Sequence, residues 1–355
     1  MSTGYDYAPK GKAEPVCRPG DFKFAATALN HGHINGQCNG LIEAGAELRW
    51  VFDPDPLKVE AFRKAFPQAA VTESLEQILE DPEIQLIAAA AVPSERGPLG
   101  VQVMRAGKHY FTDKTPFTEL GQLAEARRVA AETGKKYMVY YSERLHVECA
   151  VFAGDLIEQG AIGRVVQVLG LGPHRLSAEA RPSWFFEKAK YGGILCDIGS
   201  HQIEQFLFYS GASDATVTSA RVANYANKDY PELEDFGDAS LVADNGATSY
   251  FRVDWLTPDG LRTWGDGRTI ILGTAGYIEM RKYIDITREA LGDQLFLVNQ
   301  HGEQHFALHG KVGFPFFGRL ILDCLHGTET AMSQNHAFKA AELCLMAQVA
   351  ARRIE

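Results

Sequence analysis

The sequence lacks the features that would mark a membrane protein or a zinc-binding protein. Its longest run of small apolar residues, Ile84 to Val92, is about half as long as a bilayer crossing requires. Its six cysteines form no C-x-x-C pair and show none of the spacings typical of zinc ligands. We therefore expect no membrane partner and no bound metal, and we expect the thiols to be reduced and mostly buried.

An export signal is also missing from the first residues. Residues 1–21 contain Pro9, Lys10, Lys12 and Pro15, but they have no apolar core of a signal peptide and no twin-arginine leader. This composition predicts a flexible extension over residues 1–21 of a cytoplasmic protein.

Positive charge is scarce. Lys and Arg number 35 against 45 Asp and Glu, which gives a net charge of -10 at pH 7. Such a field repels polyphosphates, so nucleic acid is excluded as the main partner. The 46% of hydrophobic and 23% of charged residues are typical of a globular chain, and a length of 355 residues predicts two domains.

The first part of the chain alternates apolar runs with segments of helical spacing. Strands are expected at Phe22 to Leu29, Leu48 to Phe52, Ile84 to Ala91, Tyr110 to Thr112 and Tyr137 to Tyr141. Helices are expected between them, over Ile34 to Ala44, around Val59, Phe62 and Phe66, and up to a C-cap at Gly134. This alternation predicts a Rossmann domain with a doubly wound parallel sheet over residues 22–145.

After about Leu145 the pattern changes to alternating strands joined by turn-like pairs. The expected strands are Val165 to Leu169, Val217 to Val222, Ser240 to Ala243, Thr248 to Val253, Thr269 to Leu272 and Leu295 to Val298. One helix is expected over Leu145 to Gln159. A terminal helix is expected over Ala337 to Ala351, packing back on the fold through Leu343, Met346 and Val349. Residues 146–355 therefore predict an α+β domain with a mainly antiparallel sheet.

A degenerate dinucleotide-binding fingerprint follows the first strand. The segment Leu29-Asn30-His31-Gly32-His33-Ile34-Asn35-Gly36 stands where G-x-G-x-x-G would precede a helix. Gly32 would let the backbone approach a pyrophosphate, and Asn30 replaces the first glycine because Asn enters the left-handed region readily. We expect Asn30, Gly32, His33 and Ile34 to bind the cofactor. His31 and His33 also suggest a metal pair, but their loop position favours phosphate contact.

Asp53 supports this interpretation and indicates which cofactor binds. It ends the second strand about 20 residues after Gly32, the place of the acid that holds the adenosine ribose hydroxyls. A carboxylate there repels a 2'-phosphate, and no Arg or Lys stands in Asp53-Pro54-Asp55-Pro56. NAD is therefore favoured over NADP. The alternative is an ordinary strand, turn and helix in which Asp53 is only a helix cap.

Two further segments carry side chains suited to proton and hydride chemistry. Lys114 follows the strand Tyr110 to Thr112, at the sheet edge where open α/β folds bind ligands. In the segment Tyr191 to His201, Gly192 and Gly193 would allow close ligand approach, and they precede a helix on which Asp197 and His201 share one face. Either feature alone is also typical of a solvated surface.

Together these segments resemble motifs of the Gfo/Idh/MocA family of sugar and cyclitol dehydrogenases, whose members pair E-K-P with G-G-G-x-x-x-D-x-G-x-H. Here the motifs read Asp113-Lys114-Thr115-Pro116 and Tyr191 to His201, with Tyr191 in place of the first glycine. The likeness covers roughly Phe22 to Arg352. Of the family's T-P-N-x-x-H segment only Pro93 remains, in Val92-Pro93-Ser94-Glu95-Arg96-Gly97.

The resemblance implies a role for each matching residue. Lys114 would hydrogen-bond both substrate hydroxyl and cofactor, Asp197 would help to hold the substrate, and His201 would take the hydroxyl proton. Pro93 would lie on the nicotinamide side. These residue types suit the reaction because an imidazole, with an ordinary pKa of about 6.5, accepts protons near neutrality. A lysine cation stabilises negative charge on the oxygen.

Other clusters have two interpretations each. Trp184 would stack on a sugar ring, or it would belong to the core with its aromatic neighbours. Arg181 would contact polar groups of the substrate, or it would be a solvated charge. His301, His305 and His309 have the spacing of metal ligands on a helix, but His301-Gly302 predicts a hairpin turn.

We therefore expect a cytoplasmic NAD-dependent oxidoreductase acting on a sugar, cyclitol or related polyol. The resemblance also implies a homodimer or homotetramer formed through the open sheet face of the second domain. Three alternatives remain. These are an NAD-dependent glycosidase that oxidises its substrate transiently, a nucleotide-sensing regulator without turnover, and a bilin reductase-like protein. The intact set of Lys114, Asp197 and His201 argues against the last two.

Overall fold

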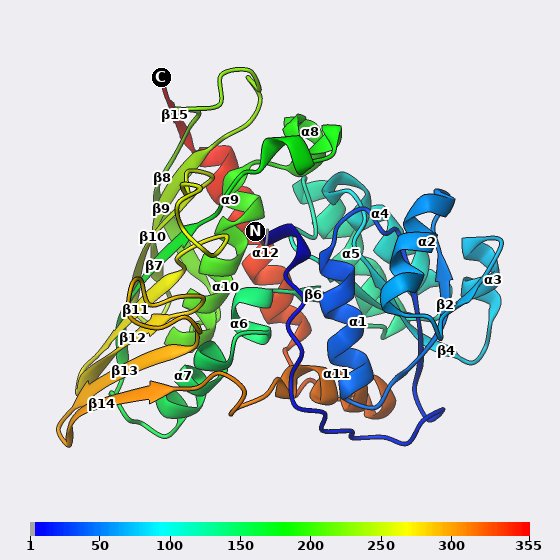
Figure 1. Ribbon diagram of the computed structural model, residues 1–355, viewed down its shortest axis with the longest axis horizontal. Helices are drawn as coiled ribbons and strands as arrows, with labels where there is room; N and C mark the ends of the chain where they lie inside the picture. The colour runs from blue at the N-terminus through cyan, green and yellow to red at the C-terminus, as the bar shows by residue number, and fades with distance from the viewer. Residues whose placement is uncertain (1–3) are drawn as a thin grey trace. The chain divides into compact units, whose positions relative to one another are not determined.

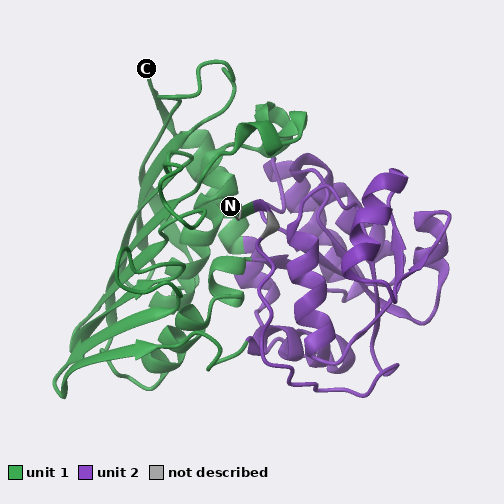
Figure 2. Cartoon of the chain, viewed as in Figure 1, with its two compact units in different colours: residues 1–4, 141–313, 339–355 green, residues 5–140, 314–338 purple. Residues whose placement is uncertain are grey.

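The computed structural model describes residues 4–355 as two compact units (Figure 2). Residues 5–140 and 314–338, drawn in purple, form the parallel-sheet unit. Residues 141–313 and 339–355, drawn in green, form the mixed-sheet unit together with Gly4. Residues 314–338 join the first unit through contacts with segments far away in sequence, which a linear pattern does not reveal. The limits 1–21, 22–145 and 146–355, and the flexibility of the first segment, stay predictions.

The parallel-sheet unit is built on six parallel strands in the order β3-β2-β1-β4-β5-β6. Their bounds are Ala70–Val71 (β3), Glu47–Phe52 (β2), Lys23–Thr27 (β1), Ile84–Ala89 (β4), His109–Asp113 (β5) and Tyr137–Tyr140 (β6). Thr27, the last residue of β1, pairs with Phe52 of β2 and with Ala89 of β4. The carboxyl ends of these strands therefore meet at one edge. The predicted doubly wound parallel sheet is confirmed.

Six helices of this unit connect or cover the strands. They are α1 (His33–Glu43), α2 (Pro56–Ala65), α3 (Leu75–Glu80), α4 (Pro93–Arg105), α5 (Leu120–Thr133) and α11 (Pro315–His326). Helix α1 packs on β2, β4 and β5, and α4 packs on β5 and α5. Helix α11 comes from late in the chain and contacts α1. The strand order reverses between β1 and β4, and α/β sheets of this kind bind ligands at that point.

The mixed-sheet unit contains nine strands in the order β14-β13-β12-β11-β7-β10-β9-β8-β15. Their bounds are Gly302–Ala307 (β14), Gln294–Asn299 (β13), Gly276–Arg281 (β12), Arg268–Gly273 (β11), Val165–Pro173 (β7), Thr248–Asp254 (β10), Phe236–Ala243 (β9), Ala215–Ala223 (β8) and Arg352–Ile354 (β15). Neighbouring strands are antiparallel except that β10 pairs with β7, and β15 with β8, in parallel. The expected mainly antiparallel sheet is confirmed. The chain between β7 and β10 contains the helices up to α10 and then β8 and β9, which is long enough for β10 to return parallel to β7.

Helices cover one face of this sheet (Figure 1). Helix α7 (Glu148–Glu158) packs on β12 and β13, α9 (Ile194–Asp197) on β9 and β10, and α10 (Gly199–Ser210) on β7 and β10. The same unit contains the short helices α6 (Ser142–Leu145), η2 (Ala178–Ala180), η3 (Ser183–Phe186) and α8 (Lys188–Tyr191), whereas η1 (Gly4–Asp6) lies where the described chain begins and belongs mostly to the parallel-sheet unit. On the other face, apolar side chains of β9 to β12 are exposed.

Two helices differ from the sequence pattern. The helix expected over Leu145 to Gln159 starts later, as α7 at Glu148, because the backbone is extended at Val147 (φ -134°, ψ 118°), and Leu145 is instead the last residue of α6. In α12 (Gln334–Ala350), Leu343 is buried, but Met346 and Val349 are 44% and 81% exposed, so the predicted packing stripe was wrong. The buried side is made largely of small residues, whose weak hydrophobic signal hides it in the sequence: Ala340, Ala341, Cys344 and Ala347.

The cysteines match the expectation of reduced, mostly buried thiols. All six are free, and Cys38, Cys149, Cys196 and Cys344 are buried. Burial raises the pKa of Cys38 and of Cys196, so these groups stay protonated and pack as small apolar side chains. No helix of residues 4–355 is both long and apolar enough to cross a bilayer.

Gly193 has a structural role in starting α9. Its φ is 98°, and a β-carbon there would lie 2.3 Å from Cδ of Gln348. The Oε1 of Gln348 accepts the N–H of Leu195 at 3.0 Å, and Glu234 Oε2 accepts the N–H of Ile194 at 3.0 Å. The space expected to admit a ligand is therefore filled by a side chain that caps the helix.

We predict that Gly193→Ala lowers the thermal unfolding midpoint more than Gly246→Ala does. Gly246 also has a positive φ, 85°, but no atom lies within 4 Å of the position its β-carbon would take. Both substitutions cost roughly 1 kcal/mol or more in backbone strain. Only the first displaces Gln348, which adds about 1 kcal/mol in hydrogen bonds. Equal midpoint shifts in circular dichroism melts would show that Gln348 is not needed at α9.

Candidate active site

The loop between β1 and α1 places the predicted cofactor-binding residues at the carboxyl edge of the parallel sheet. Gly32 is the N-cap of α1 (φ -61°, ψ -17°), and His33 and Ile34 are the first helical residues. The left-handed conformation expected at Asn30 lies instead at Ala28, whose φ is 52°. The chain therefore turns at the end of the strand. The ability of asparagine to adopt a left-handed conformation does not explain why Asn30 stands at this position.

The first amides of α1 have hydrogen-bond partners inside the loop. The N–H of His33 donates to Nδ1 of His31 at 3.2 Å, and the N–H of Ile34 donates to the His31 carbonyl at 3.2 Å. The Tyr5 hydroxyl donates to the carbonyl of Asn30 at 2.9 Å, and the Tyr5 ring centroid lies 4.3 Å from that of His31. A phosphate that binds to these amides must therefore replace His31 as their hydrogen-bond acceptor.

Asp53 lies directly after β2 and is buried. Its Oδ2 accepts the N–H of Leu29 at 2.7 Å, and its Oδ1 accepts the N–H of Asp55 at 2.9 Å. The carboxylate therefore reaches the end of β1, where the ribose-binding acid of a Rossmann domain belongs. A nearby cation is not evident from the residues directly after Asp53, because Lys58 lies within α2 and its Nζ is 4.0 Å from Asp53 Oδ1.

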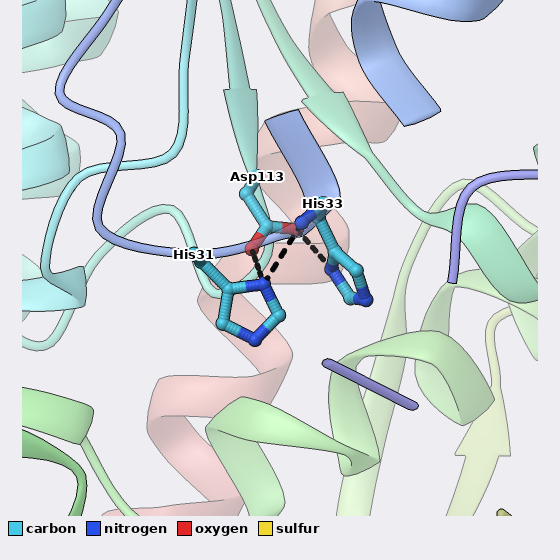
Figure 3. A group of neighbouring side chains, drawn as sticks. All are labelled: His31, His33 and Asp113. Carbon is cyan, nitrogen blue, oxygen red and sulfur yellow. Dashed lines mark hydrogen bonds and ion pairs between the residues drawn. The ribbon is translucent and has the colours of Figure 1, made fainter. Parts of the chain in front are cut away.

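Asp113, His33 and His31 form a buried polar cluster at this edge (Figure 3). Asp113 Oδ1 is 2.9 Å from Nδ1 of His33, and Asp113 Oδ2 is 3.6 Å from Nδ1 of His31. Burial acts to raise the pKa of Asp113, but the charges of His33 and Arg96 outweigh it and hold this pKa well below its usual range. Burial and the neighbouring His33 lower the pKa of His31. The cluster is thus an anionic carboxylate beside a neutral imidazole of His31.

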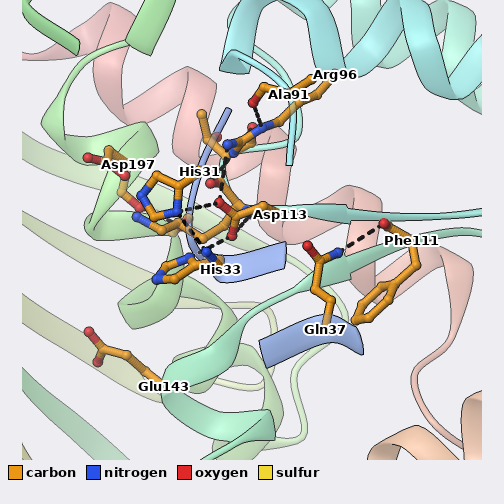
Figure 4. Close-up of polar contacts among 12 residues, drawn as sticks. His31, His33, Gln37, Ala91, Arg96, Phe111, Asp113, Glu143 and Asp197 are labelled. Carbon is orange, nitrogen blue, oxygen red and sulfur yellow. Dashed lines mark hydrogen bonds and ion pairs between the residues drawn. The ribbon is translucent and has the colours of Figure 1, made fainter. Parts of the chain in front are cut away.

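Arg96 ties this cluster to the Lys114 segment (Figure 4). Its side chain is 1% exposed, and one terminal nitrogen lies 3.1 Å from Asp113 Oδ2. Arg96 also donates to the carbonyls of Ala91 (2.7 Å), Lys114 and Thr115 (3.2 Å). Sequence reasoning missed this residue, although it lies in the segment where only Pro93 matched the family pattern.

Lys114 and Pro93 hold defined places around this arginine. Lys114 directly follows β5 and is buried, and its N–H donates to Asp113 Oδ1 at 2.8 Å. Pro93 is the first residue of α4, where proline suits a helix start. The predicted cofactor residues Asn30, Gly32, His33, Ile34, Asp53, Pro93 and Lys114 thus all lie at the ends of β1, β2, β4 and β5.

Among residues 4–355, two groups of side chains have the composition of a metal site. One ligand atom from each of His31, His33 and Asp113 lies within 4.8 Å of the others, and the same holds for Glu148, Asp293 and His309. In the first group Arg96 already neutralises the carboxylate. In the second, Glu148 accepts the N–H groups of Val312 and Gly313 at 2.8 and 2.7 Å. The His301 to His309 segment forms the predicted hairpin of β13 and β14 rather than a helix.

In the mixed-sheet unit, Asp197 and His201 lie on two consecutive short helices. Asp197 ends α9 and His201 lies in the first turn of α10, so the single expected helix is interrupted at Ile198. His201 is 2% exposed, and the Ser200 hydroxyl donates to the Asp197 carbonyl at 2.7 Å.

Arg181 and Trp184 lie in an aromatic cluster of the same unit. The Arg181 guanidinium stands 4.6 Å from the ring centroid of Phe185 and 4.9 Å from that of Trp255. Its Nε donates to the Leu176 carbonyl at 2.9 Å. Trp184 is half-buried and meets Phe185 edge-on at 5.9 Å. Arg181 is therefore a packed cation rather than a solvated charge, and a role of either residue toward substrate stays a prediction.

Sequence reasoning also missed a buried ion pair near His201. Glu143 Oε2 accepts hydrogen bonds from Lys282 Nζ at 2.8 Å and from Gln202 Nε2 at 3.0 Å. Burial acts to raise the pKa of Glu143, but the charges of Lys282, His201 and His174 outweigh it and lower this pKa to about 2. The sequence offered one indication of this residue, namely its position shortly after the last strand of the parallel sheet.

Family models match most of the chain. Residues 25–141 match the model described as an oxidoreductase family with an NAD-binding Rossmann fold, and residues 152–279 match the GFO/IDH/MocA C-terminal domain. A presumed oxidoreductase from Erwinia carotovora atroseptica SCRI1043 is 51% identical, with a TM-score of 0.91 over 94% of this chain and all of that chain.

Curated relatives include two scyllo-inositol 2-dehydrogenases of Bacillus subtilis (strain 168). The NADP(+) enzyme is 27% identical over 54% of this chain and 53% of its own length, and the NAD(+) enzyme is 25% identical over 66% of each. The chain thus spans about half the length of the former. With both domain models matched in order, the chain belongs to the GFO/IDH/MocA oxidoreductase family.

Proposed function

We propose that this protein is an NAD-dependent oxidoreductase that transfers a hydride between nicotinamide and a carbon bearing a hydroxyl group of a sugar, cyclitol or related polyol. The observation that carries the proposal is the buried arrangement of Asp113, Arg96 and Lys114 at the sheet edge where α/β folds bind ligands. The sugar-alcohol dehydrogenases among the relatives support the substrate class. Six free cysteines support a reducing, cytoplasmic compartment.

The residues of the parallel-sheet unit suit a dinucleotide. Asp53 is a buried acceptor at the end of β2, and Gly36 keeps α1 against the sheet, because a β-carbon there would lie 2.6 Å from the Tyr140 hydroxyl oxygen. When bound, NAD supplies the hydride acceptor. Asp53 would bind the ribose hydroxyls, and Lys114 would form hydrogen bonds to both the cofactor and the substrate.

Three residues would act on the substrate hydroxyl. His201 would accept its proton as the hydride leaves, because a neutral imidazole is a competent base near neutral pH. Lys114 would stabilise the negative charge that develops on the oxygen. Asp197 would help to hold the substrate, with Arg181 and Trp184 as further contacts.

We predict that His201→Ala lowers turnover by about 100-fold or more, the usual loss when a general base is removed, with NAD affinity nearly unchanged. Turnover is read at the NADH absorbance band on a panel of sugars and polyols that includes scyllo-inositol. Lys114→Ala should reduce both turnover and cofactor affinity. Oxidation should also fall at acid pH, because a protonated His201 cannot accept the hydroxyl proton. Near-normal turnover in His201→Ala with none in Lys114→Ala would reverse the two roles.

The cofactor preference depends on a carboxylate and a cation that lie together. Asp53 would repel a 2'-phosphate, whereas Lys58 would attract one, and Lys58 is one-third exposed while Asp53 is buried. The repulsion of a 2'-phosphate by the fixed, buried carboxylate of Asp53 should outweigh its attraction by Lys58. We therefore propose a preference for NAD.

We predict that calorimetric titration gives a lower Kd for NAD than for NADP. Asp53→Asn should narrow the difference between the two Kd values, because it removes the repulsion of the 2'-phosphate. Lys58→Ala should widen that difference, because it removes the attraction. Equal or tighter binding of NADP by the unmodified protein would mean that Asp53 does not hold the ribose.

The open face of the mixed sheet supports self-association. Five apolar residues of neighbouring strands are 37% to 45% exposed on it: Val242, Tyr250, Ile270, Leu272 and Tyr277. The strand register puts Leu272 opposite Tyr277 and brings Tyr250 and Ile270 to either side of Leu169. We propose that a second copy covers this face in a homodimer or homotetramer.

We predict that light scattering at micromolar concentration gives a mass of at least two chains, and that Ile270→Lys with Leu272→Lys lowers it to one. The matched control is Leu57→Lys, which adds a charge at an exposed leucine of the other unit (72% exposed) and should leave the mass unchanged. A mass of one chain for the unmodified protein would contradict self-association through this face.

A further inference from the structure

Helix α9, which ends at Asp197, is too short to fix its own direction. It has four residues, and isolated helices of this length are unstable in water, so its orientation depends on contacts with the rest of the unit. The first amides of any helix need partners outside the helix. Here the N–H of Ile194 donates to Oε2 of Glu234 at 3.0 Å, and the N–H of Leu195 donates to Oε1 of Gln348 at 3.0 Å. These two side chains therefore hold the start of α9.

Both contacts depend on Glu234, which lies just before β9 and is fully buried. Besides the Ile194 amide, its carboxylate accepts Nε2 of Gln348 at 3.0 and 3.2 Å. Glu234 thus orients the amide group of Gln348, whose oxygen then accepts from α9. Lys188 of α8 also donates to Glu234 and neutralises its charge. Donors from three helices, α8, α9 and α12, therefore converge on one carboxylate.

A single peptide group connects Glu234 to Asp197. The peptide group between Gly193 and Ile194 donates its N–H to Glu234, and its carbonyl accepts the N–H of Asp197 at 2.9 Å. Hydrogen bonds that share a peptide group polarise and strengthen each other. The carbonyl of Asp197 in turn accepts the Ser200 hydroxyl at 2.7 Å. The backbone position of Asp197 is therefore set from Glu234 through one intervening group.

We propose that Glu234 is a positioning residue for Asp197, so that it controls substrate binding without touching the substrate. This role rests on the proposed function, in which Asp197 helps to hold the substrate. Helix α10, which carries His201, has 12 residues and packs on β7 and β10 by itself. Loss of Glu234 should therefore weaken substrate binding more than it slows the chemical step.

Asp235 provides a matched control for Glu234. The two residues are neighbours in sequence, and both are 0% exposed. Asp235 accepts the N–H groups of Tyr225 and Ala226 at 2.7 Å each, so it holds the loop after β8. Glu234→Gln and Asp235→Asn each replace a buried carboxylate by an amide of the same size. Both variants should lower the thermal unfolding midpoint, which separates a loss of stability from a loss of positioning.

Hydrogen exchange of the full chain, followed by mass spectrometry, tests this contact network without any ligand. In Glu234→Gln an NH₂ group replaces one acceptor oxygen and faces other donors, so the amides of α9 should exchange about 10-fold faster or more. Asp235→Asn should change their exchange rate less than about twofold. Unchanged exchange of α9 in Glu234→Gln would overturn the positioning role.

Steady-state kinetics at saturating NAD test the role toward substrate, with whichever of scyllo-inositol and D-xylose gives the higher rate. Glu234→Gln should raise KM about 10-fold or more and change kcat less than about threefold, whereas Asp235→Asn should leave both within about twofold. In an Asp197→Asn background, Glu234→Gln should raise KM less than about twofold, because both substitutions remove the same interaction. Additive effects, or an unchanged KM in Glu234→Gln, would show that Glu234 has a structural role only.

Gln348→Met keeps the test valid if Glu234→Gln does not fold. It removes the acceptor of the Leu195 amide without a change of charge, so the exchange of α9 and KM should each rise about threefold. Unchanged exchange in Gln348→Met would contradict the positioning role.

The outcomes for the function differ from those for Glu234. Faster exchange of α9 in Glu234→Gln, with no NADH formed by the unmodified protein from any sugar or polyol, would refute the oxidoreductase and leave the contact between Glu234 and α9 standing. NADH formation with unchanged exchange in Glu234→Gln would refute the positioning role alone.

Discussion

The buried carboxylate of Asp113 fixes the site of the parallel-sheet unit. An isolated charge with 1% exposure would cost far more than a domain's margin of stability, so its position is tolerable only where cations and donors converge on it. Arg96 comes from α4, His33 from α1, and the next amide belongs to Lys114. One carboxylate therefore couples the helix of the fingerprint loop to the segment that carries the proposed catalytic lysine.

The mixed-sheet unit applies the same principle next to its own proposed reactive group. Glu143 is anionic because Lys282 lies fully buried against it, and it is close enough for His201 to affect its titration. In each unit a buried ion pair holds polar groups in place before any ligand arrives. Such preorganisation favours charge development in a reaction, because the protein dipoles do not have to reorient.

Local patterns predicted those parts of the molecule that depend on local chemistry. The strands of the parallel sheet, the C-cap at Gly134 (φ 65°) and the position of Asp53 at a strand end all follow from periodicity and from single-residue preferences. Arg96 and Lys58 were missed because each acts on a residue that another element brings close. The same is true of Gln348, which occupies the space beside Gly193 although more than a hundred residues separate them. The alanine-rich buried side of α12 was missed because its residues are individually weak signals.

Isotope transfer can follow the hydride that is proposed to pass between a carbinol carbon and nicotinamide. The protein is incubated with NAD and a polyol substrate deuterated at the reacting carbon, and the cofactor is then analysed by mass spectrometry. If the hydride is transferred directly, the label should appear on the reduced nicotinamide in proportion to the oxidised product. Product formation with the label released to water, or with no net reduction of the cofactor, would contradict it.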